Sequence, residues 1–227
     1  MTQPDQSAWP LAETPLTETP LGEIAARLPG ATAVFRSYKL DYCCGGQESL
    51  ALAVERRGLN LAEIERSLAA LDQQPVTAPD EPEDIIEFIL SRFHETHRRE
   101  LPELVELARR VEQVHAGHPD VPKGLTEFVN ALADELDSHM RKEELMLFPM
   151  IRAGHPMVSA PISVMEAEHE DHFAALKQLE AMTHNFEPPA DACASWRALY
   201  AGLRKLADDL KEHIHTENNI LFQRVGR

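Results

Sequence analysis

The chain has 227 residues, and its 22 Lys and Arg against 38 Asp and Glu give a formal net charge of −16. A surface this acidic repels nucleic acid and anionic membranes and favours a basic partner or a cation. Three cysteines argue against a disulfide framework. No apolar run reaches about 18 residues, the length that a bilayer crossing needs. We therefore expect a cytoplasmic protein that binds neither nucleic acid nor membranes.

The first third of the chain predicts a small domain between two irregular stretches. Residues 1–20 are rich in Pro, Thr and Glu and contain no hydrophobic signal core, so we expect a flexible tail. Short amphipathic segments then predict a small helical domain over residues 21–72. Residues 73–82 contain three prolines and are interpreted as a linker.

Two adjacent cysteines, Cys43 and Cys44, precede a Gly-Gly pair in this predicted domain. They stand before an expected helix start, where backbone N–H groups lower the pKa of a thiol. We therefore predict a reactive pair, although two small residues packed in a tight turn would give the same sequence. Cys193, near Trp196 at another expected helix start, is interpreted as structural.

The rest of the chain contains a duplicated motif. His139-x-x-x-Glu143 recurs 74 residues later as His213-x-x-x-Glu217, and each copy is followed by Leu-Phe at the same offset. Upstream, a His-Glu-x-His motif that begins at His94 recurs 75 residues later. One helix pair is thus written twice, which predicts a four-helix up-down bundle over residues 83–225 with a pseudo-two-fold relation.

The spacing of three and four residues within each motif places the His and Glu side chains on the apolar stripe of each helix. A Glu is almost never fully buried without a partner, and no Lys or Arg lies on these stripes. A metal is therefore the expected partner. The predicted ligands are His94, His139, Glu143, His169, His213 and Glu217.

The number and type of ligands predict the metal. Four imidazoles and two carboxylates exceed what one tetrahedral zinc uses, whereas two irons about 3.5–4 Å apart, bridged by carboxylates, use all six. The excess of neutral nitrogen favours Fe(II) and the binding of small molecules. His97 and His172, one turn further on, are either a fifth nitrogen ligand or groups that support the ligands.

Other polar residues receive secondary interpretations. Glu135 and Asp209 each precede a predicted ligand by one turn and are candidates for orienting its imidazole or conducting protons. The remaining histidines are expected to be solvated because they fall in connections or off the stripes. They are His115, His118, His155, His184 and His215.

Both parts of the chain resemble one family. The block Asp41-Tyr42-Cys43-Cys44-Gly45-Gly46, the two His-x-x-x-Glu motifs with Leu-Phe-Pro at 147–149, and Glu168-His169 look like the repair-of-iron-centres family. These YtfE/ScdA-like di-iron proteins have a hemerythrin-like bundle. The resemblance covers residues 21–225 and both motifs occur in the family's order.

The resemblance implies a protein that repairs iron–sulfur clusters damaged by oxidative or nitrosative stress. It implies a non-haem di-iron site on the six predicted ligands, with Glu143 and Glu217 as bridges, and functional roles for Cys43 and Cys44. It also implies that Glu135 and Glu168 lie near the site. Expected partners are damaged iron–sulfur proteins, nitric oxide or another diatomic ligand, and an external electron donor.

Three functions stay open at this point. In the first, the site donates iron or handles NO during repair, and the cysteines relay iron or NO. In the second, the site is an enzyme that reduces NO to N2O, with each iron supplying one electron. In the third, the bundle is a hemerythrin-like sensor of O2 or NO, which leaves the Cys-Cys-Gly-Gly domain without a task.

Overall fold

The computed structural model describes residues 15–71 and 81–225. The chain separates into two compact units near residue 78. Residues 215–220 group with the first unit, although the final helix runs through them without a break. The described ranges form helices and no strand, which confirms the predicted all-α class. None of the described helices combines the length and apolar composition that crossing a membrane requires.

The first unit packs short helices around a small apolar core. Leu21, Phe35 and Ile64 in this core have no exposed surface. Of the tail predicted over residues 1–20, residues 1–14 lie outside the described residues. Residues 15–20 belong to the folded unit, since Thr19 is buried and its carbonyl accepts a hydrogen bond from the N–H of Leu50. The helices are η2 (Leu16–Glu18), α1 (Leu21–Arg27), α2 (Ala31–Ser37), α3 (Leu50–Arg56) and α4 (Leu61–Ala69).

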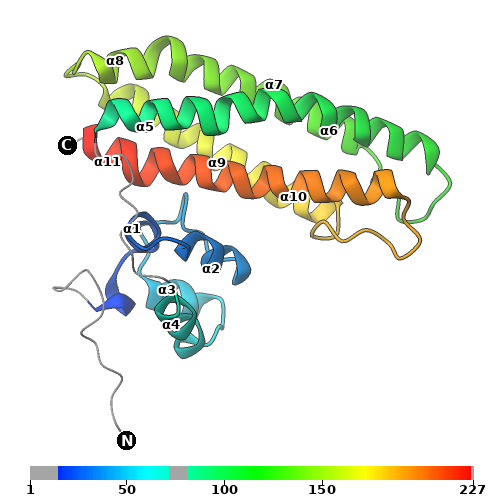
Figure 1. Ribbon diagram of the computed structural model, residues 1–227, viewed down its shortest axis with the longest axis horizontal. Helices are drawn as coiled ribbons and strands as arrows, with labels where there is room; N and C mark the ends of the chain where they lie inside the picture. Colours follow the sequence, from blue (N-terminus) through cyan, green and yellow to red (C-terminus); the bar gives the residue numbers. More distant parts are fainter. Residues whose placement is uncertain (1–14, 72–80, 226–227) are drawn as a thin grey trace, which may run out of the picture. The chain divides into compact units, whose positions relative to one another are not determined.

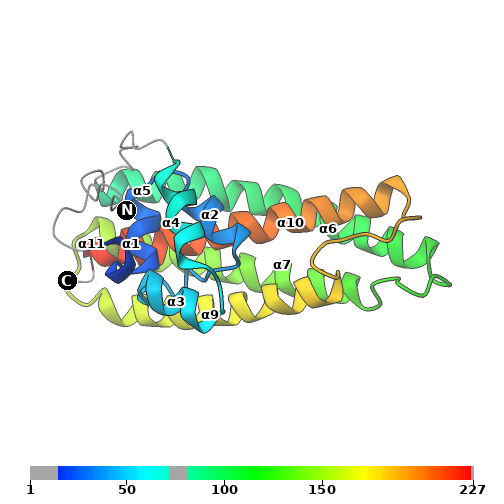
Figure 2. The same ribbon diagram turned by 90° about the horizontal axis from the view of Figure 1, so that it is seen from below.

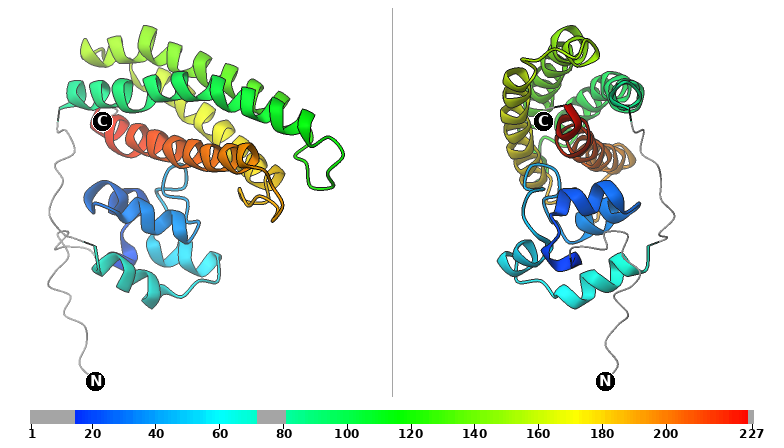
Figure 3. Two further views of the ribbon diagram at one scale, coloured as in Figure 1. Left: turned by 45° about the vertical axis from the view of Figure 1, so that its right-hand side comes forward. Right: turned by 90° about the vertical axis from the view of Figure 1, so that its left-hand side faces the viewer.

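The second unit is a bundle of four long helices, which Figures 1 and 2 show side by side and the right panel of Figure 3 shows closer to end-on. The first helix joins α5 (Pro82–Ile89), η3 (Leu90–His94) and α6 (Glu95–Val114). The second joins α7 (Leu125–Lys142), η4 (Glu143–Leu147) and α8 (Phe148–Arg152). The third is α9 (Ser159–Met182), and the fourth joins α10 (Ala194–His215), η5 (Thr216–Leu221) and α11 (Phe222–Val225).

Three of the four bundle helices contain a π-helical segment, and each segment includes a predicted metal ligand. His94 ends η3, Glu143 begins η4 and Glu217 lies in η5. A π segment adds one residue to a turn, which rotates everything after it by roughly 100° relative to a regular α-helix. Regular helical spacing from His139 and Glu143 predicts Met146 on the core stripe. Because of the π segment, Met146 is 60% exposed and Leu147 is buried instead. Such segments are frequent at functional sites.

The bundle end far from these segments is fixed by a cap between two helices. The carboxylate of Glu112 on α6 accepts hydrogen bonds from the backbone N–H groups of Gly124 (2.6 Å) and Thr126 (2.8 Å). Gly124 has a φ of 80°, a conformation that favours glycine, and stands directly before α7. Glu112 therefore satisfies N–H groups that every helix start leaves without intrahelical partners.

Candidate metal centre

Six buried side chains from the four bundle helices converge on one point. They form two groups, and in each group one ligand atom from every residue lies within 4.8 Å of the others. The first group is His94, Glu143, His213 and Glu217, and the second is His139, Glu143, His169 and Glu217. The structure thus brings together all six residues that the sequence predicted as ligands.

The two groups share both carboxylates. Glu143 has no exposed surface, and its Oε2 lies 3.3 Å from Nε2 of His94 while its Oε1 lies 3.5 Å from Nε2 of His139. One carboxylate therefore presents one oxygen to each group. Within the groups, the Nε2 atoms of His94 and His213 are 3.2 Å apart, and those of His139 and His169 are 3.1 Å apart.

This donor set suits a pair of transition-metal ions. Imidazole nitrogen with bridging carboxylate oxygen is a set that binds iron, and sites without thiolate do not select the softest metals. A buried carboxylate also requires positive charge close by, which a cation between the two oxygens and the imidazoles supplies. The residues present therefore fit transition-metal ions, which the four imidazoles and the two shared carboxylates would hold.

Each group draws one histidine from each copy of the duplicated helix pair. His94 and His139 belong to the first copy, whereas His169 and His213 belong to the second. The first group joins His94 to His213, and the second joins His139 to His169. Neither copy alone contains both imidazoles of either group.

Two carboxylates that belong to neither ligand group form hydrogen bonds with the Nδ1 atoms of two of the imidazoles. Nδ1–H of His94 donates to Glu144 at 2.8 Å, and Nδ1–H of His139 donates to Glu168 at 2.8 Å. With Nδ1 as donor, Nε2 presents its lone pair toward the centre. Glu168 stands as the resemblance implied, whereas Glu144 was not predicted: its counterpart in the second repeat is Asn218, so the duplication concealed it.

Each supporting carboxylate is paired with a cation. Arg98 donates to both oxygens of Glu144, at 2.7 and 3.1 Å, and Nζ of Lys142 donates to Glu168 at 2.6 Å. Burial raises the pKa of both carboxyl groups, but the hydrogen bonds from the cation and the imidazole outweigh it, and each pKa lies below its usual value. Both groups therefore stay ionised and keep their hydrogen bonds to the imidazoles at neutral pH.

Phenylalanine rings form the apolar wall of the centre. His94 stacks on Phe148 with ring centroids 5.9 Å apart, and His169 stacks on Phe222 at 6.2 Å. These two phenylalanines are the equivalent residues of the duplicated Leu-Phe motif. His213 stacks on Phe93 at 5.0 Å. An apolar wall of this kind limits the access of water to bound metal.

The structure favours the supporting role for His97 and His172. Both are buried, but neither belongs to a ligand group. The His97 ring lies 5.4 Å from that of His213, and the His172 ring lies 4.8 Å from that of His139. Burial, with a further contribution from His213, lowers the pKa of His97 to about 3, so this imidazole is neutral.

Two secondary predictions are corrected. Glu135 is exposed, because the buried stripe of α7 passes through Leu132, Leu136 and His139 and leaves position 135 on the flank. Asp209 does not reach the ligand groups: it accepts hydrogen bonds from Arg92 at 2.8 Å and Lys205 at 2.7 Å. The acid thus ties α10 to the first bundle helix.

The Cys-Cys motif also differs from its prediction. Helix α3 begins only at Leu50, so no helix start lies directly after Cys44. Cys43 is 2% exposed, and its pKa is raised by its hydrogen bond with Cys44, by burial and by the nearby charge of Asp41. The expectation of a lowered pKa is therefore wrong for Cys43. Cys44 is half-buried and its N–H donates to Asp41 at 3.1 Å, and neither cysteine forms a disulfide with another described residue.

The predicted solvated histidines divide into two sets. His155 and His184 are exposed as expected. His215 is buried, contrary to the prediction, and its Nδ1 lies 3.1 Å from Nδ2 of Asn219. His115 and His118 are half-buried and contact the ring of Trp196.

Comparison with known proteins places both units in one family. Residues 86–225 match the family described as the hemerythrin HHE cation binding domain, and residues 17–72 match a domain of unknown function, DUF542. The chain is 48% identical to the iron-sulfur cluster repair protein YtfE of Citrobacter koseri, Escherichia coli and Escherichia fergusonii over 211 residues, which cover 90% of this chain and 95% of each relative. With both of its units matched in this way and 48% identity over 90% of its length, the chain belongs to the YtfE family of iron–sulfur cluster repair proteins.

Proposed function

We propose that this protein repairs iron–sulfur clusters damaged by oxidative or nitrosative stress, and that it does so with two iron ions bound in the bundle. The observation that supports the metal count is that Glu143 and Glu217 belong to both ligand groups. Residues that could ligate a single ion would form one group. Two groups with common carboxylates are what two bridged ions require.

Each proposed ion has four protein ligands, namely two imidazoles and the two shared carboxylates. Iron commonly accepts more than four ligands, so positions stay open for water or a small molecule. When bound, the irons would supply a site for diatomic ligands and a source of single electrons. The protein's own contribution is to hold six ligand atoms together away from bulk water.

The supporting carboxylates give the centre a connection to solvent. The side chains of Glu144 and Glu168 are each 26% exposed, although the imidazoles that they contact are 0% and 2% exposed. Any change outside that breaks either carboxylate–imidazole hydrogen bond would weaken the hold on that imidazole. We infer that Glu144 and Glu168 make the affinity for iron sensitive to conditions in the solvent. Such sensitivity suits a protein that releases iron to a damaged cluster.

Nitric oxide reduction is the second candidate function. The two ligand groups support it, because two NO molecules must meet to form N2O and an iron held in each group would supply one binding position for NO. The reaction needs an external electron donor. In the repair proposal, by contrast, Cys43 and Cys44 relay iron or NO to a client protein in the cytoplasm.

A double substitution in the full-length protein separates these functions. Cys43→Ser with Cys44→Ser removes both thiols of the first unit and leaves the bundle ligands intact. If repair uses the cysteines, the variant keeps its iron and its NO turnover but no longer reactivates a [4Fe–4S] hydro-lyase that was damaged with NO or peroxide. Glu143→Gln should abolish both activities. Repair by the double variant at the parent's rate would remove the cysteines from the proposal.

A further inference from the structure

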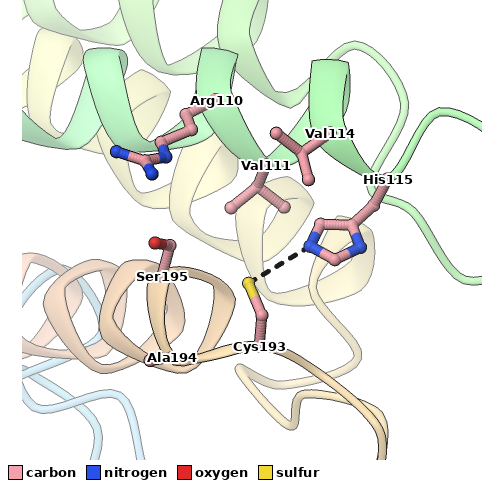
Figure 4. Close-up of a pocket in the computed structure, with 7 residues that line it drawn as sticks. All are labelled: Arg110, Val111, Val114, His115, Cys193, Ala194 and Ser195. Carbon is pink, nitrogen blue, oxygen red and sulfur yellow. Dashed lines mark hydrogen bonds between the residues drawn. The ribbon is translucent and has the colours of Figure 1, made fainter.

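A cysteine and a histidine meet at the start of α10, about 20 residues before the ligand His213. By the rise of an α-helix this is roughly 30 Å from the metal centre. Nε2 of His115 lies 3.1 Å from Sγ of Cys193, and 78 residues separate the two in the chain. Figure 4 shows the two side chains pointing toward one another and joined by this contact, among the residues that line a pocket. The metal chemistry described above uses neither residue.

The pocket beside this pair has a volume of about 260 Å³. Ligand pockets commonly span about 300–1,000 Å³, so this one fits a small molecule or one half of a larger one. Cys193 and His115 are half-buried and therefore reachable. The residues that line the pocket are Arg110, Val111, Val114, His115, Cys193, Ala194 and Ser195.

The imidazole is held in place by Trp196. The ring centroids of His115 and Trp196 are 5.0 Å apart, and Trp196 has no exposed surface. His118 contacts another part of the same tryptophan, at 5.2 Å, but its Nε2 faces Asp191 at 3.2 Å. Both histidines thus contact Trp196, and of the two it is His115 that contacts the thiol of Cys193.

Two features favour negative charge in the pocket. The carbonyl of Cys193 accepts a hydrogen bond from the N–H of Arg197 at 3.1 Å, which places Cys193 at the N-terminus of the 22-residue helix α10. The helix dipole stabilises negative charge at that end. Arg110 lines the pocket and forms no ion pair with any residue in 15–71 or 81–225. Its guanidinium is available to a carboxylate from outside.

We propose that Cys193 and His115 form a site for thiol–disulfide exchange with acidic low-molecular-weight disulfides. His115 accepts the proton of the Cys193 thiol, and the sulfur attacks one sulfur of the disulfide. The S–S bond of the small molecule breaks as the mixed disulfide on Cys193 forms. The leaving thiolate takes the proton from His115 and departs as a thiol. Arg110 selects disulfides that bear carboxylates.

The test uses the full-length protein and locates the modification by peptide mass spectrometry, which resolves Cys193 from Cys43 and Cys44. The protein is incubated with oxidised glutathione, an acidic disulfide, or with cystamine, a cationic one. We expect Cys193 to be modified first by oxidised glutathione. His115→Gln should slow both reactions at least tenfold, since general-base catalysis contributes about 10²–10⁴. His118→Gln is the matched control and should leave both rates within about twofold.

Arg110→Gln provides an independent arm, because Arg110 is exposed and its replacement is compatible with folding. It should slow the reaction with oxidised glutathione about three- to tenfold and leave that with cystamine unchanged or faster. The proposal is overturned if His115→Gln and His118→Gln react alike, or if Cys193 in the folded protein reacts no faster than in urea. An Arg110→Gln effect equal for both disulfides would overturn the selection of acidic ligands.

Discussion

Replacing Glu143 by Gln should cost the protein both metal ions, whereas replacing His94 by Gln should cost only one. Glu143 belongs to both ligand groups, and His94 belongs to the first alone. The substitution Glu143→Gln keeps the size of the side chain but removes the charge that would bridge the two proposed ions. After His94→Gln, the group of His139 and His169 still has all of its ligands.

The size of the effect on stability follows from linkage. An ion supplied at 100 to 1,000 times its dissociation constant stabilises the folded state by about 2.7–4.1 kcal/mol. In a domain of this size each kcal/mol raises the melting temperature by about 2–4 °C, so one ion should add roughly 5–16 °C. Glu143→Gln should lose most of the rise that iron produces, and His94→Gln about half.

Two measurements on anaerobically loaded protein check this prediction: iron per chain by elemental analysis, and calorimetric melting with and without Fe(II). Glu135→Gln is the control, since Glu135 lies two turns earlier on the same helix and is exposed. Its iron content and melting temperature should match the parent. Equal iron loss in the His94 and Glu143 variants, or an undiminished thermal shift in Glu143→Gln, would refute the shared-carboxylate argument.

Three further predictions concern the surroundings of the centre. Glu144→Gln and Glu168→Gln should each weaken iron binding about 10–100-fold in competition with a chelator, because each carboxylate orients a ligand imidazole, while Glu170→Gln should not. Asp209→Asn should lower the free energy of unfolding in urea by about 1.5–3 kcal/mol at pH 7. Hydrogen bonds from Arg92 and Lys205 lower the pKa of Asp209 despite its burial. The stabilisation is therefore present above the unfolded pKa and is lost as pH falls through the folded pKa, and a deficit that does not shrink as the solution is acidified would contradict this. Iodoacetamide should alkylate Cys43 more slowly than Cys44 because Cys43 is buried and its pKa is raised, which peptide mapping would show.

The six ligands could be predicted because each lies on an apolar stripe and its partner recurs in the second repeat. Burying an ionised Glu on such a stripe costs enough free energy to require a cation nearby, and the periodicity of the apolar residues is sufficient to show that the Glu is buried. The π segments could not be predicted, because a single added residue changes no composition and shifts only the register after it. Met146 and Leu147 show the result, with the predicted inward residue exposed and its neighbour buried.

Contacts between residues near the ends of different helices could not be predicted from the sequence either. His115 and Cys193 lie where no periodicity relates one segment to another, and only the folded chain brings them within 3.1 Å. The position of Cys43 was misjudged for a related reason. Ser49, whose side chain accepts a hydrogen bond from the N–H of Leu52, sets the start of α3, and the Gly-Gly pair before it does not.

The exchange of histidines between the two repeats bears on the origin of the fold. One helix pair bearing a His on its first helix and His-x-x-x-Glu on its second supplies all six ligands when two copies meet about a two-fold axis. In such a homodimer the metals would join the subunits, because every ion would take an imidazole from each. Gene fusion would then free the halves to diverge wherever the metals are not touched. Glu144 against Asn218, and Phe93 against Glu168, are positions where they have done so.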